Sequence, residues 1–189
     1  MSQLFQEDGR VVPVTVAQVQ PNTVVQVKTK NKDGYEAVQV GIGKKSKLTK
    51  PEKGHRKDFG SFAILKEFKA AGDLKVGDTI DASVFAEGDA VKVVGIAKGK
   101  GFQGVVKRHG FSGMPASHGA HSVLRHAGSI GQRFPQHTLK GMRMAGRMGG
   151  SQRTTRGLKI VKIDAEHGLI AIKGATPGNN GSIIQIISQ

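Results

Sequence analysis

Residues 90–163 read AVKVVGIAKGKGFQGVVKRHGFSGMPASHGAHSVLRHAGSIGQRFPQHTLKGMRMAGRMGGSQRTTRGLKIVKI, and this stretch contains neither Asp nor Glu. It holds 14 of the 29 Lys and Arg residues of the chain, 14 of its 27 glycines and five of its seven histidines. Because all 14 acidic residues lie outside it, the stretch carries +14 of the net charge of +15. The positive charge is therefore segregated into one segment and is not scattered over the surface.

The two ends of this stretch look like strands of a folded domain. Residues 91–96 and 158–163 are rich in β-branched side chains. The roughly sixty residues between them are poor in apolar side chains and far exceed ordinary loop lengths. Such a segment cannot bury enough apolar surface to offset the entropy of ordering it alone. Its like charges repel unless an anion neutralises them, and nucleic acid is the simplest partner.

The composition of the whole chain favours some classes of protein and excludes others. A length of 189 residues fits one domain or two small ones, and a pI of about 10.3 is typical of nucleic-acid binding. The chain has no cysteine, which excludes disulfides and thiolate metal sites. Its first residues lack the charge and apolar run of a secretory signal, and no apolar run reaches membrane length. We expect no membrane partner.

Short β-branched runs separated by turn residues predict a mainly-β fold, a barrel or a sandwich. Two strands are expected in residues 10–28 around a turn at Pro21 and Asn22, and a third in residues 35–42 after a hairpin turn at Asp33 and Gly34. Further strands are expected at 62–68, 74–80, 91–96, 158–163, 169–173 and 182–187, with turns at 71–73, 87–89 and 164–168 and a loop at 174–181.

Residues 99–104, Gly-Lys-Gly-Phe-Gln-Gly, match the pattern of a dinucleotide-binding turn after a predicted strand. The rest of that fingerprint fails. Residues 105–110 give too short a run for the required helix, and no acid follows before Asp164 to bind a ribose. The glycines instead suit a backbone that lies close to phosphates, with Lys98, Lys100, Lys107 and Arg108 supplying charge.

Catalytic and metal-binding readings have little support in this stretch. His118, His121, His126 and His137 match no standard metal spacing, and no carboxylate is near them in sequence. Stacking or hydrogen bonding to RNA is the better interpretation of these imidazoles. The absence of acids also removes paired-carboxylate catalysis. We therefore predict no catalytic residue, no metal, no cofactor and no small-molecule substrate.

Residues 44–57 form a second, smaller basic cluster. Thr49 before Pro51 suggests the start of a helix, and a solvated basic loop is equally compatible with the composition. A second contact to the same anionic partner fits either structure.

Five motifs in order resemble a known family: residues 96–111, 116–119, 128–131, 140–149 and 173–178. Their sequences, from Ile-Ala-Lys-Gly-Lys-Gly-Phe-Gln-Gly to Lys-Gly-Ala-Thr-Pro-Gly, resemble the universal ribosomal protein L-three of the large subunit, bacterial type. The resemblance runs through essentially the whole chain. It is specific because the five motifs occur together.

The resemblance implies a translation-protein-type β-barrel with a long, largely irregular basic extension inserted between two strands. Residues 1–96 and 158–189 would form the barrel, with a basic insertion at about 44–60, and residues 97–157 would penetrate rRNA. The family binds large-subunit (23S-type) rRNA directly and early in assembly, beside neighbouring ribosomal proteins. Its extension reaches towards the peptidyl transferase centre, with the distal part expected at about 140–151. A cytoplasmic ribosome is expected, and an organellar ribosome is compatible with the same features.

Two positions depart from the family pattern. Family members usually begin with a Lys- and Gly-rich stretch before the motif that starts this chain at Met1, so part of the first strand is expected to be missing. Some bacterial members carry a methylated glutamine where this chain has Arg147, so that modification cannot occur here.

We predict a structural, non-enzymatic rRNA-binding protein. The alternatives are a dissociable assembly factor or RNA chaperone, which would leave mature subunits, and an enzyme, which would need an acidic pocket or a cofactor turn. The predicted rRNA contacts are cations and histidines of the two basic segments: Lys44, Lys45, Lys47, Lys50, Arg56, Lys98, Lys100, Lys107, Arg108, His109, His118, Arg125, Arg133, Lys140, Arg143, Arg147, Arg153 and Arg156.

Overall fold

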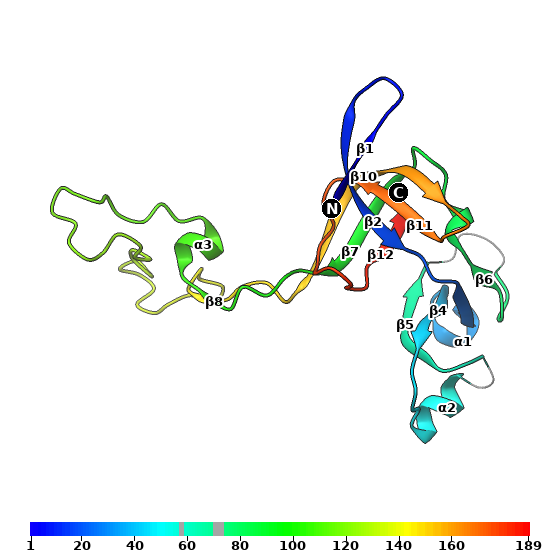
Figure 1. Ribbon diagram of the computed structural model, residues 1–189. Helices are drawn as coiled ribbons and strands as arrows, with labels where there is room; N and C mark the ends of the chain where they lie inside the picture. The colour runs from blue at the N-terminus through cyan, green and yellow to red at the C-terminus, as the bar shows by residue number, and fades with distance from the viewer. Residues whose placement is uncertain (57–58, 70–73) are drawn as a thin grey trace. The chain divides into compact units, whose positions relative to one another are not determined.

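The computed structural model describes residues 1–56, 59–69 and 74–189, and most of its regular structure is β-strand (Figure 1). The prediction of a mainly-β chain is confirmed. Strand pairing within these residues gives one six-stranded, one four-stranded and one two-stranded sheet. The pairing of the described strands does not define a closed barrel.

The described residues separate into two compact units. Unit 1 comprises Met1–Lys92, Arg156–Ala175 and Ile187–Gln189, and unit 2 comprises Val93–Thr155 and Thr176–Ile186. The predicted division into a globular domain of residues 1–96 and 158–189 and an rRNA-penetrating extension of residues 97–157 stays a prediction.

The six-stranded sheet follows from alternating β-branched residues. Its strands, in spatial order, are β1 (Ser2–Phe5), β2 (Val11–Gln18), β11 (Leu169–Lys173), β10 (Gln152–Asp164), β7 (Ala90–Ile96) and β12 (Gln185–Ser188). Strand β2 is antiparallel to both β1 and β11. Val12 and Val14 are buried while Val11 and Pro13 are exposed, as the two-residue period of a strand requires. The buried pair packs against Ala171.

The four-stranded sheet of unit 1 is antiparallel throughout. Its strands, in spatial order, are β5 (Phe62–Phe68), β4 (Ala37–Lys44), β3 (Asn22–Lys28) and β6 (Thr79–Ile80). Its core is a cluster of Val24, Val38 and Val40. The ring of Phe62 occupies the space where any side chain at Gly41 would lie, so glycine is required there.

Helical segments are short. They are α1 (Lys30–Asp33), α2 (Lys50–Arg56), the 3-10 helix η1 (Ala82–Val84) and α3 (Val105–His109). Helix α2 decides between the two structures expected for the second basic cluster. The Glu52 carboxylate accepts hydrogen bonds from the backbone N–H and the hydroxyl of Thr49 at 2.9 and 3.1 Å. A carboxylate three residues into a helix that accepts the N–H of the residue before it satisfies one of the free donors of the first turn.

Several strand predictions are confirmed and others are wrong in extent. The strands expected at 62–68, 91–96 and 169–173 are present, but the strand expected at 35–42 is displaced to Ala37–Lys44 because helix α1 and Gly34 fill the connection before it. The strand expected at 182–187 is confined to Gln185–Ser188. Both the amide and the hydroxyl of Ser182 bond the Asn179 carbonyl, which keeps that residue in a turn.

The strand expected at 74–80 is wrong for most of its length. Only Thr79–Ile80 pairs as a strand. The Lys75 N–H donates to the Asp78 carboxylate at 2.8 Å, and Gly77 has a φ of 100°, so these residues form a turn. The turn expected at 71–73 lies outside the described residues.

Residues 105–110 form a helix, against the expectation that the run was too short. Helix α3 spans five residues between Gly104, in an extended conformation, and Gly110, in the left-handed conformation that commonly ends helices. Strand β10 is also longer than the expected 158–163 and begins at Gln152.

Candidate nucleic-acid interface

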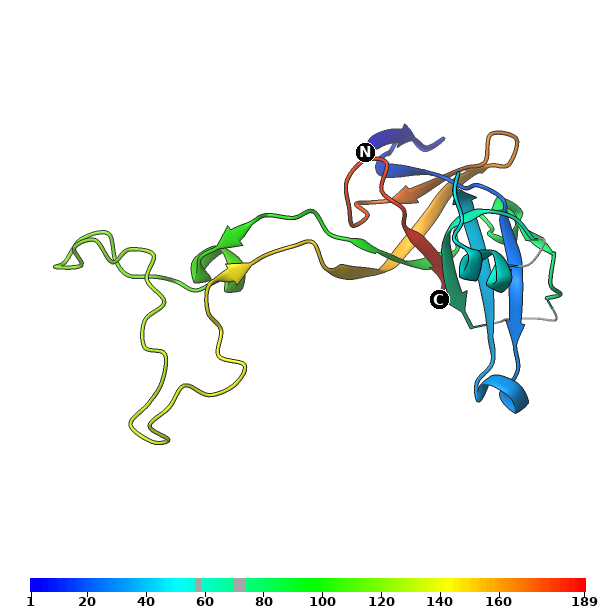
Figure 2. The same ribbon diagram turned by 90° about the horizontal axis from the view of Figure 1, so that it is seen from below.

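Unit 2 is organised by a backbone ladder between two segments about fifty residues apart in sequence (Figure 2, green and yellow). Strands β8 (Phe102–Gln103) and β9 (Gly146–Arg147) pair antiparallel, with Phe102 opposite Arg147. Four further backbone hydrogen bonds of 2.9–3.0 Å extend this pairing: Ala97 N–H to Ser151, Gly150 N–H to Ala97, Lys100 N–H to Met148 and Met148 N–H to Gly101. The basic segment is thus a ribbon along this part of its length.

Glycine makes the close approach of the two ribbon segments possible. Gly149 has a φ of 74°, and a Cβ at this position would collide with the carbonyl oxygen of Lys98. Across the ribbon, a Cβ at Gly146 would lie 2.8 Å from Nη1 of Arg108. The glycines that disfavour a helix here therefore have a second role, because they let the backbones and the Arg108 side chain pack closely.

Two basic side chains of helix α3 contact a backbone carbonyl oxygen at the start of the second ribbon segment. Arg108 Nη1 donates to the Met144 carbonyl oxygen at 2.6 Å, and Nε2 of His109 lies 3.1 Å from the same oxygen. Both side chains are half-buried, and Val105 of the same helix is buried. Arg108 and His109 were predicted as rRNA contacts, but the structure gives each of them an internal partner.

The other predicted cations of unit 2, with Arg156 just beyond it, are all exposed: Lys98, Lys100, Lys107, Arg125, Arg133, Lys140, Arg143, Arg147, Arg153 and Arg156. His118 is exposed as well. Within the part of the chain that the structure describes, no cation of residues 90–163 forms an ion pair with a carboxylate. Their charge is therefore available to an external anion.

The lysines of the second basic cluster differ in whether they pair with Glu52. Lys44, Lys47 and Lys50 are exposed, whereas Lys45 Nζ lies 2.6 Å from Glu52 Oε1. The hydrogen bond from Lys45, supported by the Thr49 amide, lowers the pKa of the Glu52 carboxyl from 4.5 to about 2. Glu52 is therefore ionised at neutral pH and retains Lys45 in an internal pair.

Arg56, another predicted rRNA contact, is buried in the structure. Its side chain is buried, with 5% of the residue exposed. Its guanidinium donates to the Phe62 carbonyl and lies 3.7 Å from Glu52. A guanidinium that is buried with these partners cannot reach a phosphate without leaving them. Glu52, four residues before Arg56 on the helix, was the available sequence signal for this pairing.

Two exposed phenyl groups in unit 2 were not among the predicted rRNA contacts. Phe102 is 73% exposed and Phe134 is 81% exposed. Phe111, which the motifs include, is half-buried, and its ring lies 6.1 Å from that of His109. Sequence identifies these residues only as apolar, because exposure depends on how the loops pack.

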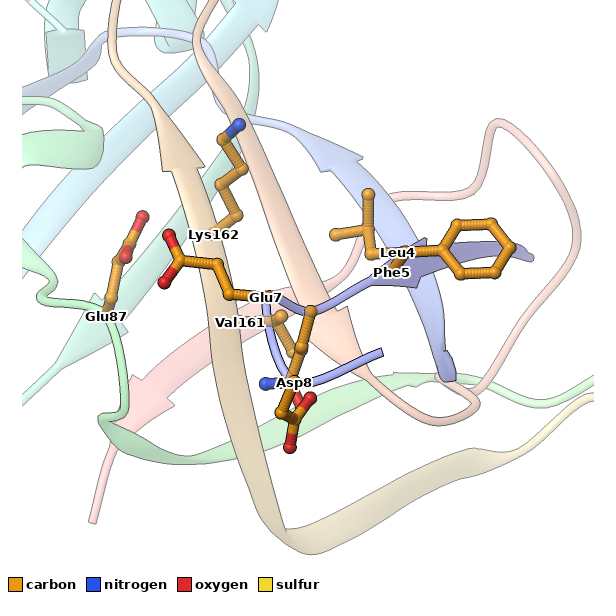
Figure 3. A pocket seen from close by; sticks show the side chains of 8 residues that line it. Leu4, Phe5, Glu7, Asp8, Glu87, Val161 and Lys162 are labelled. Atoms are coloured by element: carbon orange, nitrogen blue, oxygen red, sulfur yellow. The ribbon is translucent and has the colours of Figure 1, made fainter. Parts of the chain in front are cut away.

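A cleft in unit 1 has the wrong charge for a polyphosphate. Its volume is about 550 Å³, and its lining includes Glu7, Asp8 and Glu87 together with Lys162 (Figure 3). Glu87 also accepts a hydrogen bond from the Ile163 amide at 3.2 Å. Carboxylates at this cleft repel phosphate, so we do not include it in the candidate interface.

Two further features bear on function. Among residues 1–56, 59–69 and 74–189, no group of three or more His, Cys, Asp and Glu side chains is arranged to hold a metal ion. In the same described part of the chain, no helix has the length and apolar character needed to cross a bilayer.

Comparison with known proteins identifies relatives over nearly the full length. The chain is 46% identical to the large ribosomal subunit protein uL3 of Chlorobaculum parvum, across 100% of this chain and 94% of that protein. It is 45% identical to the protein of the same name from Dehalococcoides mccartyi strain CBDB1, with coverage of 98% and 92%. Identity to that of Streptomyces coelicolor is 48%, with coverage of 98% and 90%.

The model of the family described as ribosomal protein L3 matches residues 11–176, which include the whole four-stranded sheet and all of the acid-free stretch. The matched residues also contain the ribbon and helix α3. The chain belongs to the ribosomal protein L3 family.

Proposed function

We propose that this chain is a structural component of the large ribosomal subunit that binds large-subunit rRNA directly through unit 2. The observation that carries the proposal is the set of exposed cations in residues 90–163, which have no ion-pairing carboxylate among the described residues. Each such cation can neutralise a phosphate and release counterions into solution. The family's name, and the names of the relatives, support the ribosome as the source of that RNA.

The ribbon has a specific part in this function. Its backbone hydrogen bonds hold Lys98, Lys100 and Arg147 on two facing segments. Cations spaced along a ribbon can each contact a different phosphate, which orders the surrounding loops as the RNA folds around them. We propose that rRNA binding occurs early in subunit assembly and that residues 140–151 approach the peptidyl transferase centre, as the family resemblance implies.

The proposed partners and location follow from a place in the large ribosomal subunit. Neighbouring large-subunit proteins and 23S-type rRNA are the partners that a ribosomal place requires, and the location is the ribosome in the cytoplasm. The role is structural and not catalytic. A dissociable assembly factor remains the competing function, since it would use the same basic surface on an immature particle.

Sedimentation distinguishes these functions. A tagged chain expressed in cells is expected to sediment with mature large subunits and to stay with them after a high-salt wash, because an integrated protein is enclosed by folded rRNA. Peripheral binding through several phosphates weakens by orders of magnitude as salt rises. Release by the wash, or presence on immature particles alone, would favour the assembly factor and contradict the proposal.

A further inference from the structure

Phe134 is the most exposed large apolar side chain in the part of the chain that the structure describes, at 81%. Single exposed apolar residues are common on protein surfaces and usually need no explanation. Phe134 differs from such isolated residues in the positive charge of the sequence around it. It lies within the acid-free stretch, and exposed Arg133 directly precedes it.

The backbone around Phe134 supports this distinction. The His137 N–H donates to the Pro135 carbonyl oxygen at 2.8 Å, so the chain turns directly after Phe134. Phe111, by contrast, is half-buried beside His109. One phenylalanine of this unit is thus used in internal packing, while Phe134 projects from a tight turn next to a cation.

We propose that Phe134 is a base-stacking site for an unpaired nucleobase of rRNA, with Arg133 contacting the adjacent phosphate. This inference rests on the proposed rRNA-binding function and adds to it a specific residue and a non-electrostatic contribution. Unpaired bases in RNA loops and bulges stack on aromatic side chains, and every base offers a face that can do so. An exposed ring beside a guanidinium supplies both parts of a nucleotide contact.

The charge of the surroundings favours RNA over a protein as the occupant. An apolar protein segment would have to lie among unpaired cations such as Arg133 and Lys140, with no carboxylate of this stretch to balance them. A nucleotide brings an apolar face and a negative charge together. Phe5 provides the matched comparison: it is 71% exposed but belongs to unit 1, close to Glu7 and Asp8 (Figure 3).

The test measures equilibrium binding of the full chain to transcribed large-subunit rRNA over a range of KCl concentrations, with excess transfer RNA as competitor. Five chains are compared with the wild type: Phe134→Ala, Phe134→Leu, Phe134→Trp, Arg133→Ala and Phe5→Ala. Because every substituted side chain is exposed, the variants are expected to fold, and thermal melting of each one checks this.

Stacking predicts a distinct pattern. Phe134→Ala and Phe134→Leu should each weaken binding by at least about fivefold at every salt concentration, because both lose the aromatic face. Phe134→Trp keeps an aromatic face and should therefore bind rRNA as tightly as the wild type does. Phe5→Ala should also match the wild type. The slope of log affinity against log salt should be unchanged by Phe134→Ala but reduced by about 0.7–1 by Arg133→Ala.

Three outcomes would contradict the stacking site or the rRNA-binding function on which it rests. Full binding by Phe134→Ala or Phe134→Leu would overturn the stacking site while leaving rRNA binding in place. Equal weakening by Phe5→Ala would also overturn it, because the loss would then follow from any exposed ring. A wild-type chain that does not bind rRNA above the competitor level would overturn the proposed function and this inference with it.

Discussion

The two units use their charged residues in opposite ways. Every ion pair among the described residues lies in unit 1: Arg10–Asp8, Lys28–Glu67, Lys45–Glu52, Arg56–Glu52 and His167–Asp164. Lys28 also donates to the Tyr35 hydroxyl at 2.6 Å, and its bond to Glu67 is the main reason that the pKa of Lys28 is raised. Unit 1 therefore contains internal ion pairs, whereas the exposed cations of unit 2 have no carboxylate partner among the described residues.

The two units also differ in how many apolar side chains they bury. Of the buried apolar side chains in the described part of the chain, all but Val93, Val94 and Val105 belong to unit 1. Unit 1 is therefore stabilised mainly by burial of apolar surface. Unit 2 depends on backbone hydrogen bonds and close glycine contacts, which suits a segment that we propose is ordered further by RNA.

The largest expected effect comes from a cavity in unit 1. Ile170 is fully buried, so Ile170→Ala should lower the free energy of unfolding by about 2–5 kcal/mol. Leu124→Ala in unit 2 should change it by less than about 0.5 kcal/mol, because Leu124 is exposed. Urea denaturation followed by circular dichroism measures both. Similar losses for the two variants would show that the units do not differ in packing as described.

A smaller and more local effect is expected at the ribbon. Gly149→Ala places a Cβ against the Lys98 carbonyl, whereas Gly150→Ala meets no atom within 4 Å although its φ is also positive. The two variants share the cost of a left-handed alanine, roughly 1–2 kcal/mol. The additional collision should raise the exchange rate of the Lys100 amide about tenfold more in Gly149→Ala than in Gly150→Ala. Equal exchange rates would contradict the close approach of the two segments.

The smallest expected effect is the pH dependence of the Glu52 pair. Because the pKa of Glu52 is lowered from 4.5 to about 2 in the folded chain, its stabilising contribution is complete above about pH 4.5. It should disappear as the pH falls from 4.5 to 2. Glu52→Gln is therefore expected to lower the melting temperature slightly at pH 7 and to match the wild type near pH 2. Exposed Glu36, changed to Gln, is the control, and an equal loss there would contradict a specific role for Glu52.

Local sequence signals predicted much of unit 1. Runs of β-branched residues bounded by turn residues located strands such as β5 and β11, because those signals act within a few neighbouring residues. The ribbon of unit 2 was not predicted. It depends on hydrogen bonds between segments about fifty residues apart, which no local pattern specifies.

The candidate interface was predicted in charge but not in detail. The sequence locates all cations, yet it does not show that Arg56 and Arg108 have internal partners while Arg133 and Arg147 are exposed. Both guanidinium groups donate to backbone carbonyl oxygens, of Phe62 and Met144. Every residue carries such an oxygen, so these contacts have no sequence signal, and only the Glu52 partner of Arg56 could have been inferred from spacing.

We propose that the exposed cations of unit 2, and not the net charge of the chain, bind rRNA. The most direct measurement is the salt dependence of rRNA affinity for two variants that each replace four exposed cations with Gln. One variant changes Lys98, Lys100, Arg143 and Arg147 of unit 2, and the other changes Lys30, Lys32, Lys66 and Lys75 of unit 1. The salt slope is expected to fall by about 3 in the first variant and by less than 1 in the second. Equal reductions in the two variants would contradict it.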